Sequence, residues 1–150
     1  MTDAPMHPRI ALITLGVNDL ETALVFYRDG LGLPTQGIIG TEFPGDAASA
    51  AGAVVMFTLE HGLILALYPR RELAKDAHEP VGVASSTEFS IGHLVQSREE
   101  VDALLVRAAA AGATVTDAPH ERPWGIYSGY FKDLDGHLWE IVYNPQPLPV

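Results

Sequence analysis

An internal repeat constrains the fold of this chain more than any other feature. Leu12 in an apolar run and the potential helix cap Asp19 are seven positions apart, and Ser90 and Ser97 repeat this spacing 78 positions later. Such a repeat indicates two copies of one supersecondary unit. One copy is too small to bury both faces of a sheet well. Two copies packed together, in one chain or in two, are therefore expected to enclose a cleft.

The first module, about residues 9–68, is predicted to have the order β-α-β-β-β. Its apolar run 9–17 predicts a strand, and apolar residues at helical spacing follow up to Leu31. The small, polar, Gly- and Pro-containing segment 41–52 predicts a mobile loop placed to lie over a site. Further strands are expected at residues 35–40, 53–59 and 63–68, with a hairpin turn at 60–62.

The second module, about residues 88–145, repeats this order after a linker, residues 69–87, that carries a short helix at 71–77. Ser97 and Glu100 have the spacing of a capping box at the start of the second helix. Residues 117–125, DAPHERPWG, are expected to form a proline-bearing loop. Strands are expected at residues 88–95, 113–116, 127–132 and 138–143. The whole chain, residues 1–150, is predicted to be a single α+β domain.

One residue breaks the apolar pattern of the last hairpin. Glu140 lies inside the strand sequence LWEIVY, residues 138–143. A buried carboxylate is costly unless it is paired, hydrogen-bonded or bound to a metal ion. Glu140 is therefore expected to face a pocket, a partner or an ion.

The charge and composition argue against several classes of function. The net charge of −10 opposes binding to the phosphates of nucleic acid. No apolar run approaches the roughly 18 residues of a membrane helix, so no membrane partner is expected. The chain has no cysteine, which rules out a disulfide framework and a thiol nucleophile. We expect a cytoplasmic protein.

Two motifs resemble those of a known family. The segments NDLETALVFYRDGLGL, residues 18–33, and FKDLDGHLWEIVYNP, residues 131–145, resemble the vicinal oxygen chelate superfamily. This superfamily includes glyoxalase I, bleomycin-resistance proteins, fosfomycin-resistance enzymes and extradiol dioxygenases. The resemblance covers about residues 9–145 and is closest to the glyoxalase-like subgroup. It implies two tandem β-α-β-β-β modules that form a curved mixed sheet around a cleft, and it implies a homodimer.

In the metal-dependent members of that family, the ligands come from the first and last strands of each module. Carried over to this chain, those positions are Leu12, Ala66, Ser90 and Glu140. A catalytic divalent ion normally needs at least three protein ligands, and of these four only Glu140 is a good one. The resemblance thus implies that no metal or other cofactor is bound. A divalent metal held by Glu140 and a rebuilt ligand set is the alternative.

Two histidines are the nearest further donors for such a rebuilt set. His93 lies three positions after Ser90 and His137 three positions before Glu140, so strand alternation turns both histidines to the opposite face. A one-residue slip in register would turn His93 into the pocket.

The residues expected to face the cleft define a candidate ligand site. Apolar walls with a few hydroxyl groups and one carboxylate are typical of a small-molecule pocket, although the same residues can also fill a core. Trp124, Tyr127 and Tyr130 are aromatic groups that can stack on a flat or cationic ligand. The candidate ligand-binding residues are Leu12, Thr14, Phe57, Ala66, Tyr68, Ser90, Trp124, Tyr127, Tyr130 and Glu140.

Two classes of function follow from this site. The first is a metal-independent protein, similar to bleomycin-resistance proteins, that binds a small organic ligand in an apolar pocket near Glu140. The second is a metal-dependent enzyme resembling lactoylglutathione lyase or a dioxygenase. In an enzyme, Glu140 is the candidate catalytic residue, because an apolar setting raises the pKa of a carboxyl toward the range of a general base. In a binding protein, Glu140 is either a polar anchor for a cationic group or a vestige of the metal site. The metal content of the purified protein separates the two classes.

Overall fold

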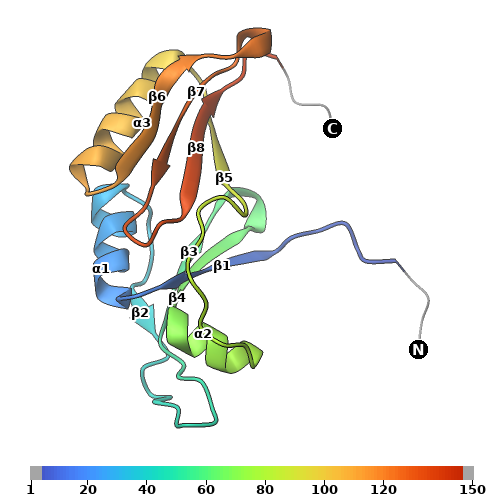
Figure 1. Ribbon diagram of the computed structural model, residues 1–150, viewed down its shortest axis with the longest axis vertical. Helices are drawn as coiled ribbons and strands as arrows, with labels where there is room; N and C mark the ends of the chain where they lie inside the picture. The colour runs from blue at the N-terminus through green and yellow to red at the C-terminus, as the bar shows by residue number, and fades with distance from the viewer. Residues whose placement is uncertain (1–4, 147–150) are drawn as a thin grey trace.

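The computed structural model describes residues 5–146. Its elements follow one another in the order predicted from the repeat (Figure 1). In the first module they are β1 (Leu12–Val17), α1 (Leu20–Leu24), the π-helical turn η1 (Val25–Gly30), β2 (Ile38–Ile39), β3 (Val54–Thr58), the 3-10 turn η2 (Glu60–Gly62) and β4 (Ile64–Pro69). They continue with α2 (Arg70–Ala77), β5 (Ile91–Val95), α3 (Arg98–Ala110), β6 (Thr114–Glu121), the 3-10 turn η3 (Pro123–Gly125), β7 (Tyr127–Lys132) and β8 (Leu138–Tyr143).

The strands form two four-stranded mixed sheets, one from each module. Sheet A has the order β1-β4-β3-β2 and sheet B the order β5-β8-β7-β6. In each sheet the first strand of the module pairs in parallel with the last, so Thr14 lies opposite Ala66 and Gly92 opposite Glu140. These matching registers confirm the predicted α+β fold of two β-α-β-β-β modules. The two sheets remain separate and open.

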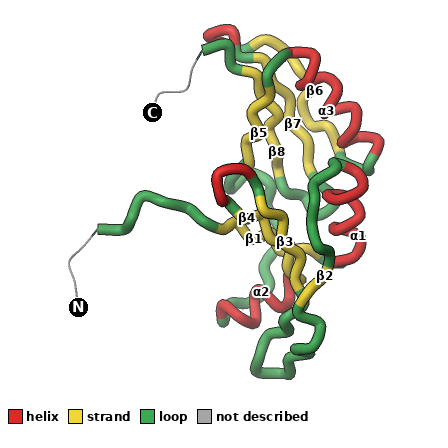
Figure 2. Tube along the Cα trace, turned by 180° about the vertical axis from the view of Figure 1, so that it is seen from behind, coloured by secondary structure: helices red, strands yellow, loops and turns green. Residues whose placement is uncertain are grey.

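Helices α1 and α3 form one layer and the two sheets form another. Figures 1 and 2 show α1 and α3 along one side of the molecule, with the strands of both sheets on the other side. Alternate strand residues face the helices and are buried, among them Leu15 and Phe57 in sheet A and Phe131 and Ile141 in sheet B. One hydrophobic core therefore continues through both modules. Among the described helices, none has the length and hydropathy to cross a lipid bilayer.

The predicted helix caps are present. The Asp19 carboxylate accepts a hydrogen bond from the backbone N–H of Thr22 at 2.9 Å. The Ser97 hydroxyl accepts one from the N–H of Glu100 at 3.2 Å, and the carboxylate of Glu100 accepts one from Gln96 at 2.6 Å. These bonds satisfy backbone donors that an uncapped helix would leave unpaired.

The first helix widens into a π-helical turn before it ends at Gly30. A methyl group at Gly30 would lie 2.5 Å from the side-chain carbon of Ala111, just after α3. The Gly30 carbonyl also accepts a hydrogen bond from Arg107 in α3 at 2.7 Å. Glycine at this position therefore allows the helices of the two modules to touch.

The prediction for residues 113–125 was wrong. A strand at 113–116 followed by a loop at 117–125 was expected, but β6 continues to Glu121. Pro119 is tolerated because β6 is an edge strand, where a missing backbone donor costs little. The register between β6 and β7 shifts between Val115 and Asp117 and again between Asp117 and His120, around this proline.

Candidate functional site

The sheet face opposite the core carries most of the predicted ligand-binding residues. In sheet A, Thr14, Ala66 and Met56 form one row across three strands. A pocket of about 260 Å³ lies over this row. It is lined by Leu12, Thr14, Val54, Met56, Ala66 and Tyr68 from the sheet, Ala51 and Gly52 from the preceding loop, and Leu73 and Asp76 from α2. The structure thus brings together four predicted residues, Leu12, Thr14, Ala66 and Tyr68.

The loop of residues 41–53 forms one wall of this pocket and is tied to its neighbours. The hydroxyl of Tyr68 donates a hydrogen bond to the carbonyl of Ala51, and the N–H of Ala51 donates to the Glu72 carboxylate at 2.7 Å. Lys75 donates to the carbonyl of Asp46 at 2.8 Å. The bond from Ala51 lowers the pKa of Glu72, whereas burial raises the pKa of Tyr68. Helix α2 and strand β4 therefore hold the loop beside the pocket.

Sheet B carries a second pocket on the corresponding face. It has a volume of about 390 Å³ and is lined by Thr87, Phe89, Ser90, Thr116, Tyr130 and Leu138. Ser90 and Tyr130 are predicted site residues, and four of the six lining side chains carry a hydroxyl group. This pocket can offer several hydrogen bonds to a ligand beside the rings of Phe89 and Tyr130.

Glu140 lies in the middle of the same sheet face and is partly buried. Its neighbours in the strand registers are Gly92 on β5 and Tyr130 on β7. A methyl group added at Gly92 would meet no heavy atom within 4 Å. Open space therefore lies on one side of Glu140 and a phenol on the other. Burial, together with the Glu140 carboxylate, raises the pKa of Tyr130.

Arg122 packs against the ring of Tyr130. Its guanidinium lies 5.4 Å from the centre of the Tyr130 ring, within the range of a cation–π contact. It also donates hydrogen bonds to the hydroxyl of buried Ser128 at 2.5 Å and to Asp117 at 2.8 Å. The bond from Arg122 lowers the pKa of Asp117, which His120 also contacts at 3.1 Å. Residues 117–122 thus bring polar groups to the site.

The sequence does not predict a role for Asp117, His120 or Arg122, because its pattern predicts a loop over residues 117–125. A signal was nevertheless present in the last hairpin. A strand at 127–132 can be paired over its whole length only by a neighbour longer than the four residues 113–116. Extending that neighbour brings Arg122 alongside β7.

Three predicted site residues lie elsewhere. Phe57 is fully buried in the core, with its ring 6.0 Å from that of Tyr27. Tyr127 faces α3, where its hydroxyl donates to Asp102 at 2.6 Å. Trp124 is 84% exposed in the turn between β6 and β7. Strand alternation explains Phe57 and Tyr127, since each is an odd number of positions from a pocket residue on its own strand.

The donor set does not fit a catalytic divalent ion. At the four positions carried over from metal-dependent relatives, Leu12 and Ala66 present hydrocarbon side chains to the sheet A pocket and Ser90 a hydroxyl to the sheet B pocket. The two histidines do not complete the set. His93 lines a cavity with Phe131 and Trp139, and the ring of His137 is hydrogen-bonded to Asp133 at 2.7 Å. Within residues 5–146, no three His, Asp or Glu side chains form a metal-binding group.

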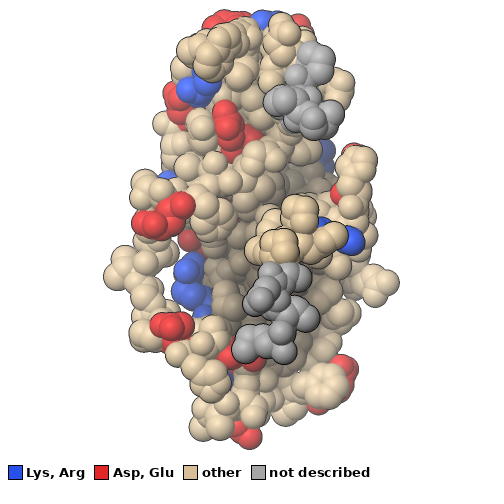
Figure 3. All heavy atoms as spheres, turned by 90° about the vertical axis from the view of Figure 1, so that its right-hand side faces the viewer, with Lys and Arg blue, Asp and Glu red and all other residues tan. Residues whose placement is uncertain are grey.

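The face that carries both pockets is visible in space-filling view. Figure 3 shows the side of the molecule opposite α1 and α3, and its surface is hollowed along the middle. Both acidic and basic groups lie around the hollow. Two open mixed sheets, each built from one β-α-β-β-β module, define the fold class as glyoxalase-like.

Comparison with known proteins gives the family. The profile of the Glyoxalase/Bleomycin resistance protein/Dioxygenase superfamily matches residues 9–141, so the chain belongs to this superfamily. The chain is 30% identical over 149 residues to the uncharacterized protein PA2024 of Pseudomonas aeruginosa, with 95% of this chain and 93% of that protein covered.

Solved structures show the same fold. A glyoxalase-related enzyme from Fulvimarina pelagi superposes with a TM-score of 0.76 at 28% identity, covering 96% of this chain and 94% of that one. The hypothetical protein SA1046 from S. aureus superposes with a TM-score of 0.72 at 24% identity, covering 93% and 95% of the two chains.

Proposed function

We propose that this protein binds a small organic molecule on the open sheet face, beside Glu140 and without a metal ion. The row Gly92, Glu140 and Tyr130 carries this proposal, because it sets empty space next to a partly buried carboxylate and a phenol. A carboxylate in such a position is stabilised when a ligand supplies hydrogen-bond donors or a positive charge. Glu140 is then the polar anchor of the ligand, and Tyr130 is a wall held in place by Arg122.

The apolar part of the ligand has a matching surface. The sheet A pocket is mainly hydrocarbon, with the hydroxyls of Thr14 and Tyr68 and the carboxylate of Asp76 as its polar groups. Binding sites for small molecules commonly combine such apolar walls with a few polar groups. The two pockets suit a ligand with one apolar and one hydrogen-bonding end.

A second copy of the chain is part of the proposal. On the open sheet faces Leu12, Leu94 and Met56 are 50%, 48% and 41% exposed. Apolar groups gathered on one face are a common sign of a protein interface. We expect a homodimer in which the partner covers these faces and completes the cleft, and sedimentation equilibrium tests this. A monomer at all concentrations would contradict the proposed homodimer but would not contradict the proposed ligand site at Glu140.

A thermal-shift screen of cationic and aromatic compounds tests the ligand site. A true ligand is expected to raise the melting temperature of the wild type, as any molecule that binds only the folded state does. The shift should fall sharply in Glu140→Gln, which keeps the shape of the side chain and removes its charge. Glu60→Gln, in the exposed turn η2, is the matched control for loss of one negative charge. Hits that respond equally to both substitutions would contradict a site at Glu140.

A further inference from the structure

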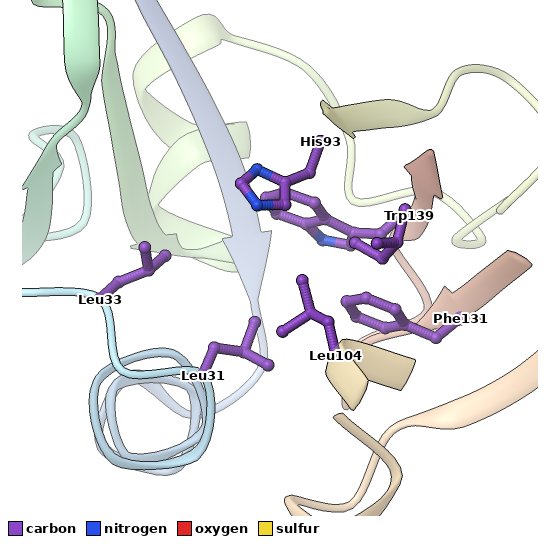
Figure 4. A pocket seen from close by; sticks show the side chains of 7 residues that line it. Leu31, Leu33, His93, Leu104, Phe131 and Trp139 are labelled. Carbon is purple, nitrogen blue, oxygen red and sulfur yellow. The ribbon is translucent and has the colours of Figure 1, made fainter. Parts of the chain in front are cut away.

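We propose a second ligand site, for a compact aliphatic molecule with one hydroxyl group, in the cavity between the two modules. The cavity has a volume of about 90 Å³. Figure 4 shows its lining, with Leu31 and Leu33 from the first module on one side and groups of the second module on the other. The full lining is Leu31, Leu33, His93, Leu104, Phe131, Trp139 and Ile141.

This cavity is separate from the face that carries Glu140. Phe131 and Trp139 are opposite each other in the register of β7 and β8, and the next pair along is Tyr130 and Glu140. Successive residues of a strand point to opposite faces of the sheet. The walls of the cavity therefore belong to the core side of sheet B.

The chemistry of the lining favours a hydrocarbon group over water. Six of the seven lining side chains are apolar. The indole N–H of Trp139 is already used, since it donates to the hydroxyl of Tyr27 at 3.1 Å. A buried water needs two to four polar partners, and apolar cavities stay dry and take apolar molecules. Among the described residues, only the imidazole of His93 offers a hydrogen-bonding side chain to an occupant.

The size of the cavity and the position of His93 in its lining set the class of ligand. A dry cavity of roughly 150 Å³ holds benzene, so one of about 90 Å³ suits a smaller, branched aliphatic group. His93 is an exposed residue, and it marks the side of the cavity that opens to solvent. A single hydroxyl on the ligand would lie there and bond to the imidazole. Natural interiors contain few voids of this size, and a ligand would restore the lost packing contacts.

Titration with 2-methylpropan-1-ol, whose branched hydrocarbon group has only four carbons, followed by NMR of the leucine methyl groups, tests this site. Saturable shifts are expected for Leu31, Leu33 and Leu104, which line the cavity. The methyls of Leu12 on the open face of sheet A should stay unchanged. The same titration with ethylene glycol should produce no saturable shift, because that molecule has no branched hydrocarbon group.

Substitutions on opposite sides of sheet B provide the control. Leu104→Phe fills the cavity and is expected to weaken alcohol binding at least tenfold, whereas Leu94→Phe, the same change on the exposed face of β5, should leave it unchanged. His93→Ala removes the hydroxyl partner and should weaken binding about three- to tenfold without unfolding the protein. This variant keeps the test decisive even if Leu104→Phe does not fold.

Two results would overturn the proposal. One is the absence of saturable shifts at the three cavity leucines up to the solubility limit of the alcohol. The other is equal binding by wild type and His93→Ala together with shifts on both sheet faces, which would indicate general surface association. Neither result bears on the Glu140 site, since that site lies on the other face.

Discussion

The hydroxyl of Tyr27 donates a 2.5 Å hydrogen bond to the carboxylate of Asp133, 106 positions further along the chain, and this bond joins the two modules. Both side chains are buried. The same carboxylate is hydrogen-bonded to the ring of His137 at 2.7 Å and accepts the backbone N–H groups of Asp135 and His137. Much of the DLDGH motif thus holds the modules together.

Removing the Tyr27 hydroxyl should destabilise the protein. Tyr27→Phe takes one donor from a buried carboxylate and one acceptor from the indole N–H of Trp139. Hydrogen bonds to charged groups contribute about 1.5–3 kcal/mol each, so a loss in that range is expected in urea unfolding. Tyr127→Phe removes a hydroxyl that bonds to Asp102 at the surface, where solvent screens the interaction, and should cost clearly less than Tyr27→Phe. Equal losses for the two variants would contradict a structural role for Tyr27.

Stability should depend on pH through Asp133. Burial alone would raise the pKa of this carboxyl, but the hydrogen bonds from His137 and Tyr27 outweigh burial and lower the pKa from its usual value of 3.8. A lowered pKa in the folded state means that stability is fully present above pH 3.8 and is lost as the pH falls through the folded-state pKa. The free energy of unfolding should therefore decline below about pH 4.

Asp133→Asn provides the comparison for that pH profile. The variant is expected to be less stable at neutral pH, because an uncharged amide is a weaker acceptor for Tyr27 and His137. Its unfolding free energy should fall less steeply in acid than that of the wild type. Parallel acid profiles for the two proteins would assign the pH dependence to other carboxylates.

The wall of the sheet A pocket should loosen when its hydrogen bonds to α2 are cut. In Glu72→Ala the N–H of Ala51 loses its acceptor, so its amide hydrogen should exchange faster, on the order of tenfold. Asp76→Ala, one turn further along α2, removes a carboxylate without a bond to Ala51 and serves as the control. Unchanged exchange at Ala51 in Glu72→Ala would show that the bond to Glu72 does not hold the loop.

Two glycines of sheet B should respond differently to alanine. Gly92→Ala adds a methyl group where no heavy atom lies within 4 Å, so the melting temperature should hardly change. The same change at Gly129 would bring the methyl to 3.0 Å from the backbone of Asp117 and Pro119 and should destabilise the sheet by about 1–3 kcal/mol.

Substitutions at Gly92 should affect ligand binding although they hardly affect stability. Gly92→Ala, and more strongly Gly92→Val, narrows the space beside Glu140 and should weaken ligand binding in a folded protein. Calorimetric titration of both variants with a hit from the screen measures this. Full affinity in Gly92→Val would place the ligand elsewhere.

Much of the fold could be predicted because the repeat carries its own register. The seven-residue spacing set Leu12 and Ser90 at matching places in the two modules, and in the structure Leu12 begins β1 and Ser90 directly precedes β5. The hairpin strands 127–132 and 138–143 also match β7 and β8, because their turn chemistry leaves little choice of ends.

Other parts of the fold depend on contacts between residues that are distant in sequence, and the local sequence carries only a weak signal for them. Pro119 suggested a loop, yet pairing with β7 keeps β6 extended across it. Phe57 and its neighbour Met56 are both apolar, so composition alone did not show which one faces the pocket. The joint between Tyr27 and Asp133 depends on how the modules pack, which no short pattern encodes.

The most direct test of the account is a calorimetric titration of metal-stripped protein with a ligand found in the screen. We predict that the metal-stripped wild type binds as tightly as untreated protein and that Glu140→Gln weakens binding about tenfold or more. The stripped protein needs a check by elemental analysis for nickel, zinc, manganese and iron. Binding that disappears on stripping and returns with one of these ions would contradict the central claim and indicate a metal site that includes Glu140.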